Sequence, residues 1–347
     1  MKNNIFISIA SYRDTELIPT LDSLLNMSSQ TSRLHVVVCW QDEGNLSEFE
    51  QAGILLRADG MVGEFPVFRA SIQGTTIDVI SVHYTQSRGA GFARHLCETR
   101  YDNEAYFLQI DSHCRFVSGW DDKMIAMLEN LRVQSVRPVL STYPPDYQPG
   151  PPEIRSEFLS RLVFKAFTQE GFSMQTSVPV RAERPLRNCY LAGGFIFADG
   201  HFVKNVPSDP NIFFYGEEIS MAVRAFTHGY DAYTPHTFLL WHCYGRRDKP
   251  KVWYDHNNQA KEKGEVRRAW WEWDQASKSR VAALLTSGVT SDTKWLGSMR
   301  TLQDFCYASG LCFLTRRVHP DVISKKCSYF DVQDVDYDNW QTNLITP

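Results

Sequence analysis

The sequence predicts an α/β protein in which a mostly parallel, Rossmann-like central sheet is covered by helices on both faces. The main observation is that strand-length apolar runs alternate with segments of helical periodicity over residues 1–142, as in parallel sheets. The second is the composition, because 43% hydrophobic and 22% charged residues are typical of a globular protein. A length of 347 residues allows one large domain or two modest ones.

The elements of this pattern can be placed in order along the first part of the chain. Asp14 is expected to cap the first helix, in which leucines recur at helical spacing. The stretch between the second and third strands is only weakly patterned. The expected strands cover residues 5–10, 34–40, 76–84, 106–110 and 136–142, and the expected helices follow Asp14, span residues 89–101 and begin at residues 118–122.

The pattern breaks at the proline-rich residues 143–152 and returns near residue 190. The segment up to Arg187 has little periodicity and could be a lid or an acceptor loop. A strand is expected over residues 190–197 with Gly193 and Gly194 inside it, which often marks a close approach of the backbone to a ligand. A further helix is expected to stop at Gly229, and residues 232–241 are partly strand-like.

The apolar run of residues 106–110 ends in polar residues that indicate a binding site. Asp111 and His113 lie two residues apart at the exit of an expected buried strand, so they point to the same face of the extended chain. Ligands bind at this edge of open α/β sheets. A carboxylate with an imidazole is a plausible partial shell for a divalent metal such as Mn²⁺. The alternative is a strand end with a capping aspartate and a hydrogen-bonded core histidine.

Three other groups are candidates for the same site, each with a plainer alternative. His242 follows an apolar segment and would be a third metal ligand, or else a structural histidine. Glu217 and Glu218 precede a helix, where one could bind sugar hydroxyls and the other could cap the helix. The glycine-rich segment from Arg88 to Arg94 opens a helix and could bind anions. Arg94 could instead pair with Asp111 or cover the helix surface.

With these residues in place, the chain resembles the GT-A-fold glycosyltransferases. More narrowly, it resembles the cytosolic polypeptide α-N-acetylglucosaminyltransferases that act on hydroxyproline of a ubiquitin-ligase subunit, and their bacterial relatives. The Asp-Ser-His-Cys run is also similar to that of the mucin-type polypeptide GalNAc-transferases. The matching segments are residues 7–14, 88–94, 109–114, 119–120, 193–194, 216–219, 241–242, 297–302 and 309–310.

This resemblance implies a GT-A fold with a C-terminal helical extension and a retaining transfer from a UDP-sugar, with UDP-GlcNAc as the preferred donor. The acceptor would be a hydroxyl of a protein hydroxyproline, serine or threonine, and the cofactor a divalent metal, Mn²⁺ in preference to Mg²⁺. No convincing covalent nucleophile is evident in the sequence, so a front-face displacement is expected.

The resemblance also implies roles for individual residues. Asp111, His113 and His242 would hold the metal. The remaining donor contacts would come from Ser11, Tyr12, Arg13, Gln41 or Asp42 at the uridine, from Arg88, Arg94 and Ser112 near the phosphates, and from Gly193, Gly194 and Glu217 at the sugar, with Glu217 and Glu218 as the candidate catalytic carboxylates.

Three regions are expected along the chain. Residues 1–142 would bind the donor and residues 143–245 the acceptor and sugar, together forming the catalytic domain. Residues 246–347 would be an extension packed on it, which is basic and tryptophan-rich at first, with 14 Lys or Arg against 8 Asp or Glu in residues 246–317. A solvated helical face is the plainer explanation of that charge.

The remaining features favour a cytoplasmic enzyme. The N-terminus shows no secretory pattern, no apolar run approaches the ~20 residues of a membrane helix, and the eight cysteines form no CxxC pair, as expected of free thiols. A net charge of −4 argues against a protein that coats nucleic acid. Two alternatives remain: a transferase that builds a capsule or lipid-linked glycan, with at most peripheral membrane contact, and a non-catalytic nucleotide or nucleic-acid binding module.

Overall fold

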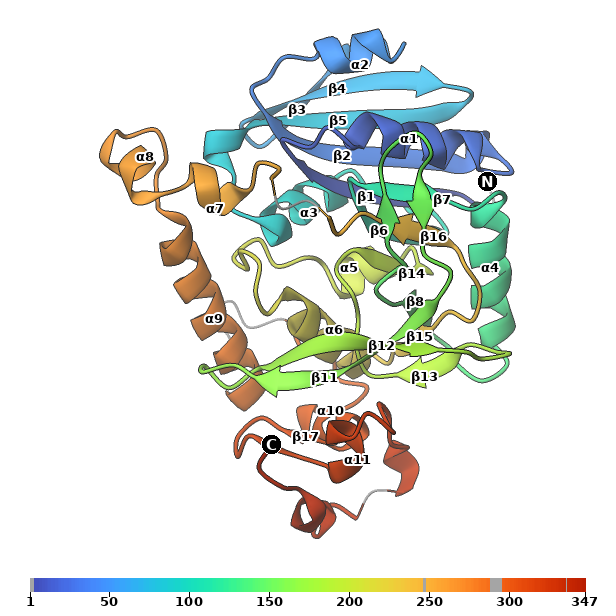
Figure 1. Ribbon diagram of the computed structural model, residues 1–347, viewed down its shortest axis with the longest axis vertical. Helices are drawn as coiled ribbons and strands as arrows, with labels where there is room; N and C mark the ends of the chain where they lie inside the picture. Colours follow the sequence, from blue (N-terminus) through green and yellow to red (C-terminus); the bar gives the residue numbers. More distant parts are fainter. Residues whose placement is uncertain (1–2, 246–247, 288–294, 335) are drawn as a thin grey trace.

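A ten-stranded sheet runs through the molecule, with helices on either side of it (Figure 1). The computed structural model describes residues 3–245, 248–287, 295–334 and 336–347. In spatial order the strands of this sheet are β13 (Leu186–Asn188), β15 (Asp231–Thr234), β8 (Pro138–Ser141), β14 (Phe195–Asp199), β6 (Tyr106–Asp111), β1 (Ile5–Tyr12), β2 (Leu34–Asp42), β5 (Thr75–His83), β4 (Phe65–Ile72) and β3 (Arg57–Val62).

The sheet is mixed, whereas the sequence predicted a mostly parallel one. Strand β1 pairs in parallel with β2 and β6, β2 with β5, and β8 with β15. The other five pairings are antiparallel. At the β3–β4–β5 edge the strands follow one another through short turns, which suit antiparallel neighbours. β13 and β14 also run antiparallel to their neighbours, although long stretches of chain lie between them and those neighbours. The parallel strands that the sequence predicted at the centre are confirmed.

Two hydrophobic cores cover the two faces of the sheet, as the α/β prediction requires. In β1 the side chain of Phe6 joins one core and those of Ile5 and Ile7 join the other, because successive strand residues point to opposite faces. The first core contains the apolar faces of α3 and α6, and the second contains those of α1 and α4. The helices up to residue 245 are α1 (Leu17–Asn26), α2 (Ser47–Gln51), α3 (Ala90–Glu98), α4 (Trp120–Leu131), α5 (Phe202–Asn205) and α6 (Glu217–Thr227).

Several local expectations are corrected by the structure. The weakly patterned stretch forms the β3–β4 hairpin, and much of the expected lid is a second hairpin of β11 (Leu159–Phe167) and β12 (Ser173–Val180). Both hairpins are partly exposed and therefore lack a continuous apolar pattern. Gly193 and Gly194 lie in a turn that precedes β14 rather than inside a strand. Asp14 is not the capping residue of α1, which is Glu16.

Two short strand pairs lie within the first 245 residues: β7 (Cys114–Phe116) with β16 (Leu240–His242), and β9 (Tyr147–Gln148) with β10 (Ile154–Arg155). A third pair, β17 (Leu311–Cys312) with β18 (Arg317–Val318), lies in the C-terminal segment. The C-terminal segment lies along the left and lower side of the view in Figure 1. Its helices are α7 (Val252–Asp255), α8 (Asn258–Glu262), α9 (Trp270–Ser287), α10 (Leu302–Ser309) and α11 (Pro320–Ile323).

Three of the six tryptophans of the C-terminal segment have a cationic side chain of the same chain over the ring. Arg268 lies over Trp273 at 4.6 Å, and Arg224 of α6 lies over Trp295 at 4.4 Å. All eight cysteines are free, as the sequence predicted. Within the described ranges, the chain forms no helix that combines the length and the apolar character needed to cross a membrane.

Candidate active site

The site lies where the chain reverses its direction of travel across the sheet. From β1 the chain adds β2 and β5 on one side, and then returns to place β6 on the other side of β1. The carboxyl ends of β1 and β6 therefore flank a topological switch point, the position at which open α/β sheets bind ligands. Asp111 is the last residue of β6 and Ser11 and Tyr12 end β1.

The short pair of β7 and β16 brings the two histidines to Asp111. β7 begins at Cys114, directly after His113, and its antiparallel register pairs Cys114 with His242. His242 Nε2 lies 3.0 Å from Asp111 Oδ2, and the two imidazole rings are 4.5 Å apart between centroids. Asp111, His113 and His242 each offer a ligand atom, and these atoms all lie within 4.8 Å of one another. The three predicted ligands thus come together.

Asp14 fixes the orientation of His113, a contact that the sequence did not predict. Its Oδ2 lies 2.8 Å from His113 Nδ1 and also accepts the hydroxyl hydrogen bond of Ser112, while its Oδ1 accepts the N–H of Glu16 at 3.0 Å. Because a carboxylate only accepts hydrogen bonds, His113 Nδ1 carries a proton, and in the neutral ring Nε2 then has the lone pair. The hydroxyl of Ser112, which was expected near the donor phosphates, donates to Asp14 in this structure.

Arg94 joins Asp111 to Glu217. The buried guanidinium donates to Asp111 Oδ1 at 2.9 Å and to Glu217 Oε1. Burial alone would raise the pKa of Asp111, but the hydrogen bond from His242 and the charge of Arg94 outweigh it and hold that pKa well below its usual range. Asp111 is therefore an anion at neutral pH. In this structure Arg94 pairs with protein carboxylates, one of the alternatives left open by the sequence.

The glycine pair packs against these same side chains. A Cβ on Gly193 would lie 2.7 Å from Arg94 Nη1, and a Cβ on Gly194 would lie 2.8 Å from Asp111 Oδ2. The turn is held in place because Gln109 Nε2 donates to the carbonyl of Gly193 at 2.8 Å. The close approach that the glycines signalled is thus an approach to the site's own side chains.

Glu218 faces the same turn from the first turn of α6. Its Oε1 accepts the N–H of Gly193 at 3.0 Å and its Oε2 accepts the hydroxyl of Tyr143 at 2.7 Å. Burial raises the pKa of Glu218 to about 7, although these two hydrogen bonds act in the opposite direction. Neither glutamate is the N-cap residue of α6, which is Gly216 in a left-handed conformation with φ of 90°. Tyr143 lies in the proline-rich stretch, where no sequence signal set it apart.

The residues expected at the uridine lie at the ends of β1 and β2. Tyr12 and Gln41 are neighbours in the parallel register, and Gln41 holds the carbonyl of Ser11 at 3.3 Å. Arg13 adopts a positive φ of 45° and lies over the ring of Tyr84 at 4.5 Å.

Asp255 of α7 closes this end of the site, a second contact that the sequence did not predict. It accepts the hydroxyl of Tyr12 at 2.8 Å and a hydrogen bond from Arg13 at 3.1 Å. Two expected residues stand apart from these contacts: Asp42 accepts the N–H of Glu43, and Arg88 approaches Glu64 at 3.6 Å. The structure thus gathers most of the predicted site at one sheet edge, and leaves Arg88 outside it.

The mixed sheet, the helices on both faces and the acidic strand end at β6 define a GT-A glycosyltransferase fold. The crystal structure of GalNAc-T7 with UDP, GalNAc and Mn²⁺ matches 99% of this chain with a TM-score of 0.53 and 13% identity. The chain spans 55% of the length of that GalNAc-T7 chain. The structure of residues 1–349 of TarS from S. aureus matches 82% of this chain, and the match covers 72% of that 1–349 chain, with a TM-score of 0.43 and 12% identity.

Comparison of the sequence with models of protein families shows which family the chain belongs to. The model of the family described as Glycosyltransferase (GlcNAc) matches residues 4–49 and 45–310. The chain therefore belongs to the Glycosyltransferase (GlcNAc) family. No curated protein is similar enough in sequence to count as a match.

Proposed function

We propose that this glycosyltransferase moves GlcNAc from UDP-GlcNAc to a hydroxyl of a protein hydroxyproline, serine or threonine, with retention of configuration and with help from a divalent metal. The observation that carries this proposal is the convergence of Asp111, His113 and His242 at the switch point of the sheet. Family membership supports the sugar, and the UDP, GalNAc and Mn²⁺ in the GalNAc-T7 structure are in keeping with the donor class and the metal.

The three side chains fit a divalent cation. They supply one hard oxygen and two imidazole nitrogens, a set that suits Mn²⁺ better than Mg²⁺, which prefers oxygen ligands. Asp14 holds His113 in the tautomer that a ligand needs. When bound, the cation would neutralise negative charge on the donor diphosphate as UDP leaves.

Arg94 acts as a positioning residue in this proposal. Its guanidinium is buried between Asp111 and Glu217, so it keeps Asp111 ionised and aimed toward the two histidines. The Gly193–Gly194 turn lies directly against this pair and would form the floor beneath the donor sugar. Arg94 would therefore act on the donor phosphates through Asp111, and its direct approach to the ribose-phosphate stays a prediction.

The two glutamates favour a front-face displacement over a covalent intermediate. Glu217 is neutralised by Arg94, and Glu218 accepts two hydrogen bonds and has a pKa of about 7. A carboxylate held in an ion pair and a carboxyl group that is partly protonated are both weak nucleophiles. The leaving diphosphate would then take the proton of the acceptor hydroxyl, while Glu218 orients the Gly193 turn.

The nucleotide would lie at the carboxyl ends of β1 and β2. Tyr12, Arg13 and Gln41 offer a ring, a cation and an amide there, and Ser11 and Asp42 flank them. We further propose that residues 1–142 bind the donor and residues 143–245 present the acceptor.

A screen of nucleotide sugars tests this function. Thermal stabilisation and hydrolysis would be measured for UDP-GlcNAc, UDP-GalNAc, UDP-glucose and GDP-mannose, with Mn²⁺ or with EDTA. We expect UDP-GlcNAc with Mn²⁺ to give the largest shift and the fastest hydrolysis, and the His113→Ala variant to lose both. Equal stabilisation in EDTA would refute the metal assignment, and a preference for GDP-mannose would refute the donor. Mass spectrometry of a hydroxyproline peptide and of a glycan acceptor then separates the two acceptor classes.

A further inference from the structure

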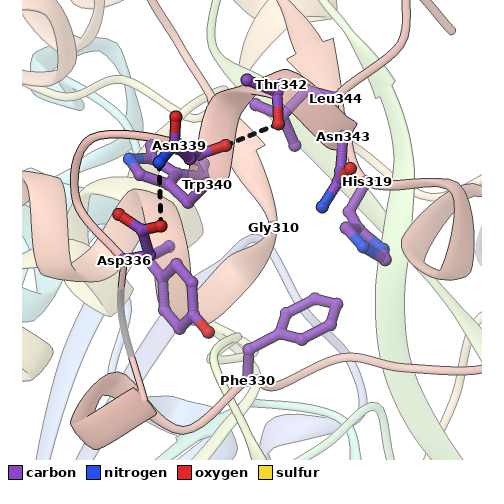
Figure 2. Close-up of a pocket in the computed structure, with 10 residues that line it drawn as sticks. Gly310, His319, Phe330, Asp336, Asn339, Trp340, Thr342, Asn343 and Leu344 are labelled. Atoms are coloured by element: carbon purple, nitrogen blue, oxygen red, sulfur yellow. Dashed lines mark hydrogen bonds between the residues drawn. The ribbon is translucent and has the colours of Figure 1, made fainter.

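A cavity of about 250 Å³ lies in the C-terminal segment (Figure 2), and none of the residues that line it belongs to the Asp111 site. It is enclosed by the end of α10, the turn at His319 that begins α11, and the last residues of the chain. Of the residues that line it, only Tyr307 and Gly310 fall within the part matched by the family model, which ends at residue 310. The cavity is therefore built mainly by what this chain adds beyond the family match.

The inner wall of the cavity is aromatic. The ring of Tyr307 packs against Phe330 and Trp340 with centroid distances of 6.3 and 6.0 Å, and Leu344 is buried beside them. Gly310 allows this wall to form, because a Cβ there would lie 2.8 Å from a ring atom of Phe330. Trp340 is 8% exposed, and among the described residues its indole N–H has no hydrogen-bond partner.

The outer rim is polar and exposed. Asp336 and Asn339 lie on one side of the cavity in Figure 2 and are joined by a hydrogen bond of 3.0 Å. Asn343 lies on the opposite side, near His319. His319 Nδ1 accepts the N–H of Asp321, so in the neutral ring the other nitrogen carries the proton and can donate.

This combination selects one ligand class. The lining holds a carboxylate, two amides and the hydroxyls of Tyr307 and Thr342, but no lysine or arginine, so an anionic group such as a phosphate would be repelled. Carboxylate and amide groups suit hydroxyls, which donate and accept at once, and an aromatic wall suits the C–H face of a sugar ring. A quaternary ammonium ion would use the rings but leave the amides unused. The volume is below the ~300–1,000 Å³ typical of drug-sized ligands, which points to a single ring.

We infer that this cavity is a second carbohydrate site, which binds one neutral monosaccharide unit of a glycan independently of the donor site. The sugar ring lies on the Trp340 and Tyr307 side, with its hydroxyls on Asp336, Asn339 and Asn343. This binding goes beyond the transfer reaction and is measured without turnover.

Saturation-transfer NMR on the full chain tests this inference. Glucose, galactose, mannose, GlcNAc and GalNAc are titrated with the donor site filled by UDP and Mn²⁺, and tetramethylammonium and inorganic phosphate are titrated in parallel. We expect at least one sugar to bind. Asn343→Ala, at an exposed position, and Trp340→Phe, which replaces the indole of the aromatic wall by a smaller ring, should each weaken that binding at least about fivefold. Asn26→Ala, exposed on α1, is the matched control and should leave binding unchanged.

The outcomes separate this inference from the proposed function. Mn²⁺-dependent hydrolysis of the UDP-sugar should stay unchanged in the Asn343 and Trp340 variants, and sugar binding should survive in His113→Ala. The inference is overturned if no sugar binds, if both cavity variants bind the sugar as tightly as the wild-type chain does, or if only tetramethylammonium or phosphate binds. If the wild-type chain binds a sugar but does not hydrolyse any UDP-sugar, the proposed function alone is overturned.

Discussion

Asp14→Asn is the most informative single change at the candidate metal site. Asp14 uses one oxygen for Ser112 and His113 and the other for the N–H of Glu16. All three groups donate, and an amide of the same shape has only one accepting atom. The amide of the variant must therefore either turn its NH₂ group toward His113 or oppose the N–H of Glu16. In both cases the orientation of His113 is less well defined.

The size of the effect follows from the hydrogen bond that is lost. A hydrogen bond to a charged group contributes about 1.5–3 kcal/mol, which corresponds to about 10–150-fold in affinity at ~1.4 kcal/mol per factor of ten. Removal of the hydrogen-bond partner of a metal-binding histidine typically lowers metal affinity or activity by about 10–100-fold in other proteins. We expect the Mn²⁺ concentration for half-maximal hydrolysis to rise by a factor in this common range, with little change at saturating Mn²⁺.

The assay combines Mn²⁺ titration of UDP-sugar hydrolysis with measurement of free Mn²⁺ by electron paramagnetic resonance. Asp22→Asn is the matched control, because Asp22 is exposed on α1, the helix that follows Asp14, and its side chain accepts a hydrogen bond from Asn26. Thermal unfolding in EDTA shows whether a variant is folded. A midpoint within twofold of wild type in a folded Asp14→Asn protein would refute the reasoning, as would an activity loss that saturating Mn²⁺ does not reverse.

Three further predictions concern the groups around this position. His113→Ala should lower metal-dependent hydrolysis by more than about 100-fold, beyond the loss from an outer hydrogen bond, with the unfolding temperature in EDTA retained; full activity that EDTA does not affect would contradict the metal assignment. Arg94→Met should cost ~3–5 kcal/mol of unfolding free energy in denaturant titrations, because it leaves two carboxylates without their buried partner. Arg88→Met, at an exposed ion pair, should cost under about 1 kcal/mol. Similar losses in the two variants would show that burial of the Arg94 ion pairs is unimportant. Burial raises the pKa of Glu218 to about 7 from an ordinary 4.5, so the folded chain binds more protons than the unfolded chain in that window and loses stability as the pH rises through it. Glu218→Gln should remove this loss, so its stability relative to wild type should rise by about 2 kcal/mol between pH 5 and pH 8. Glu98→Gln should behave similarly in stability, since burial also raises the pKa of Glu98 to about 7, but only Glu218→Gln should change hydrolysis. A flat stability difference for Glu218→Gln would refute the pKa argument.

The sequence was sufficient for the centre of the fold and for placing Asp111 and His113 together at one strand end. The strand ending in Asp111 is apolar apart from Gln109 because both of its faces are buried, and such a run is visible without a structure. Asp111 and His113 then follow from their place at the strand end. His242 required the family resemblance, since only the register of β7 and β16 brings it to Asp111.

The contacts that complete the site could not be predicted in the same way. Asp14 lies 99 residues from His113 along the chain, and Asp255 lies 243 residues from Tyr12. An aspartate before a helix has a sufficient local explanation as a cap, so nothing in the sequence separates Asp14 from an ordinary capping residue. Tyr143 was hidden for a similar reason, because prolines around it obscure any periodic pattern.

The antiparallel strand β14 explains how the glycine turn reaches the site. β14 runs antiparallel to β6 with Phe195 opposite Ile110, so the residues just before β14 lie beside the carboxyl end of β6. A parallel β14 would place its own carboxyl end, at Asp199, next to Asp111 instead. The carboxylate would then face a second aspartate rather than a turn without side chains, and like charges at that distance would raise the pKa of Asp111. The departure from the predicted parallel sheet is thus what gives Asp111 a neutral neighbour.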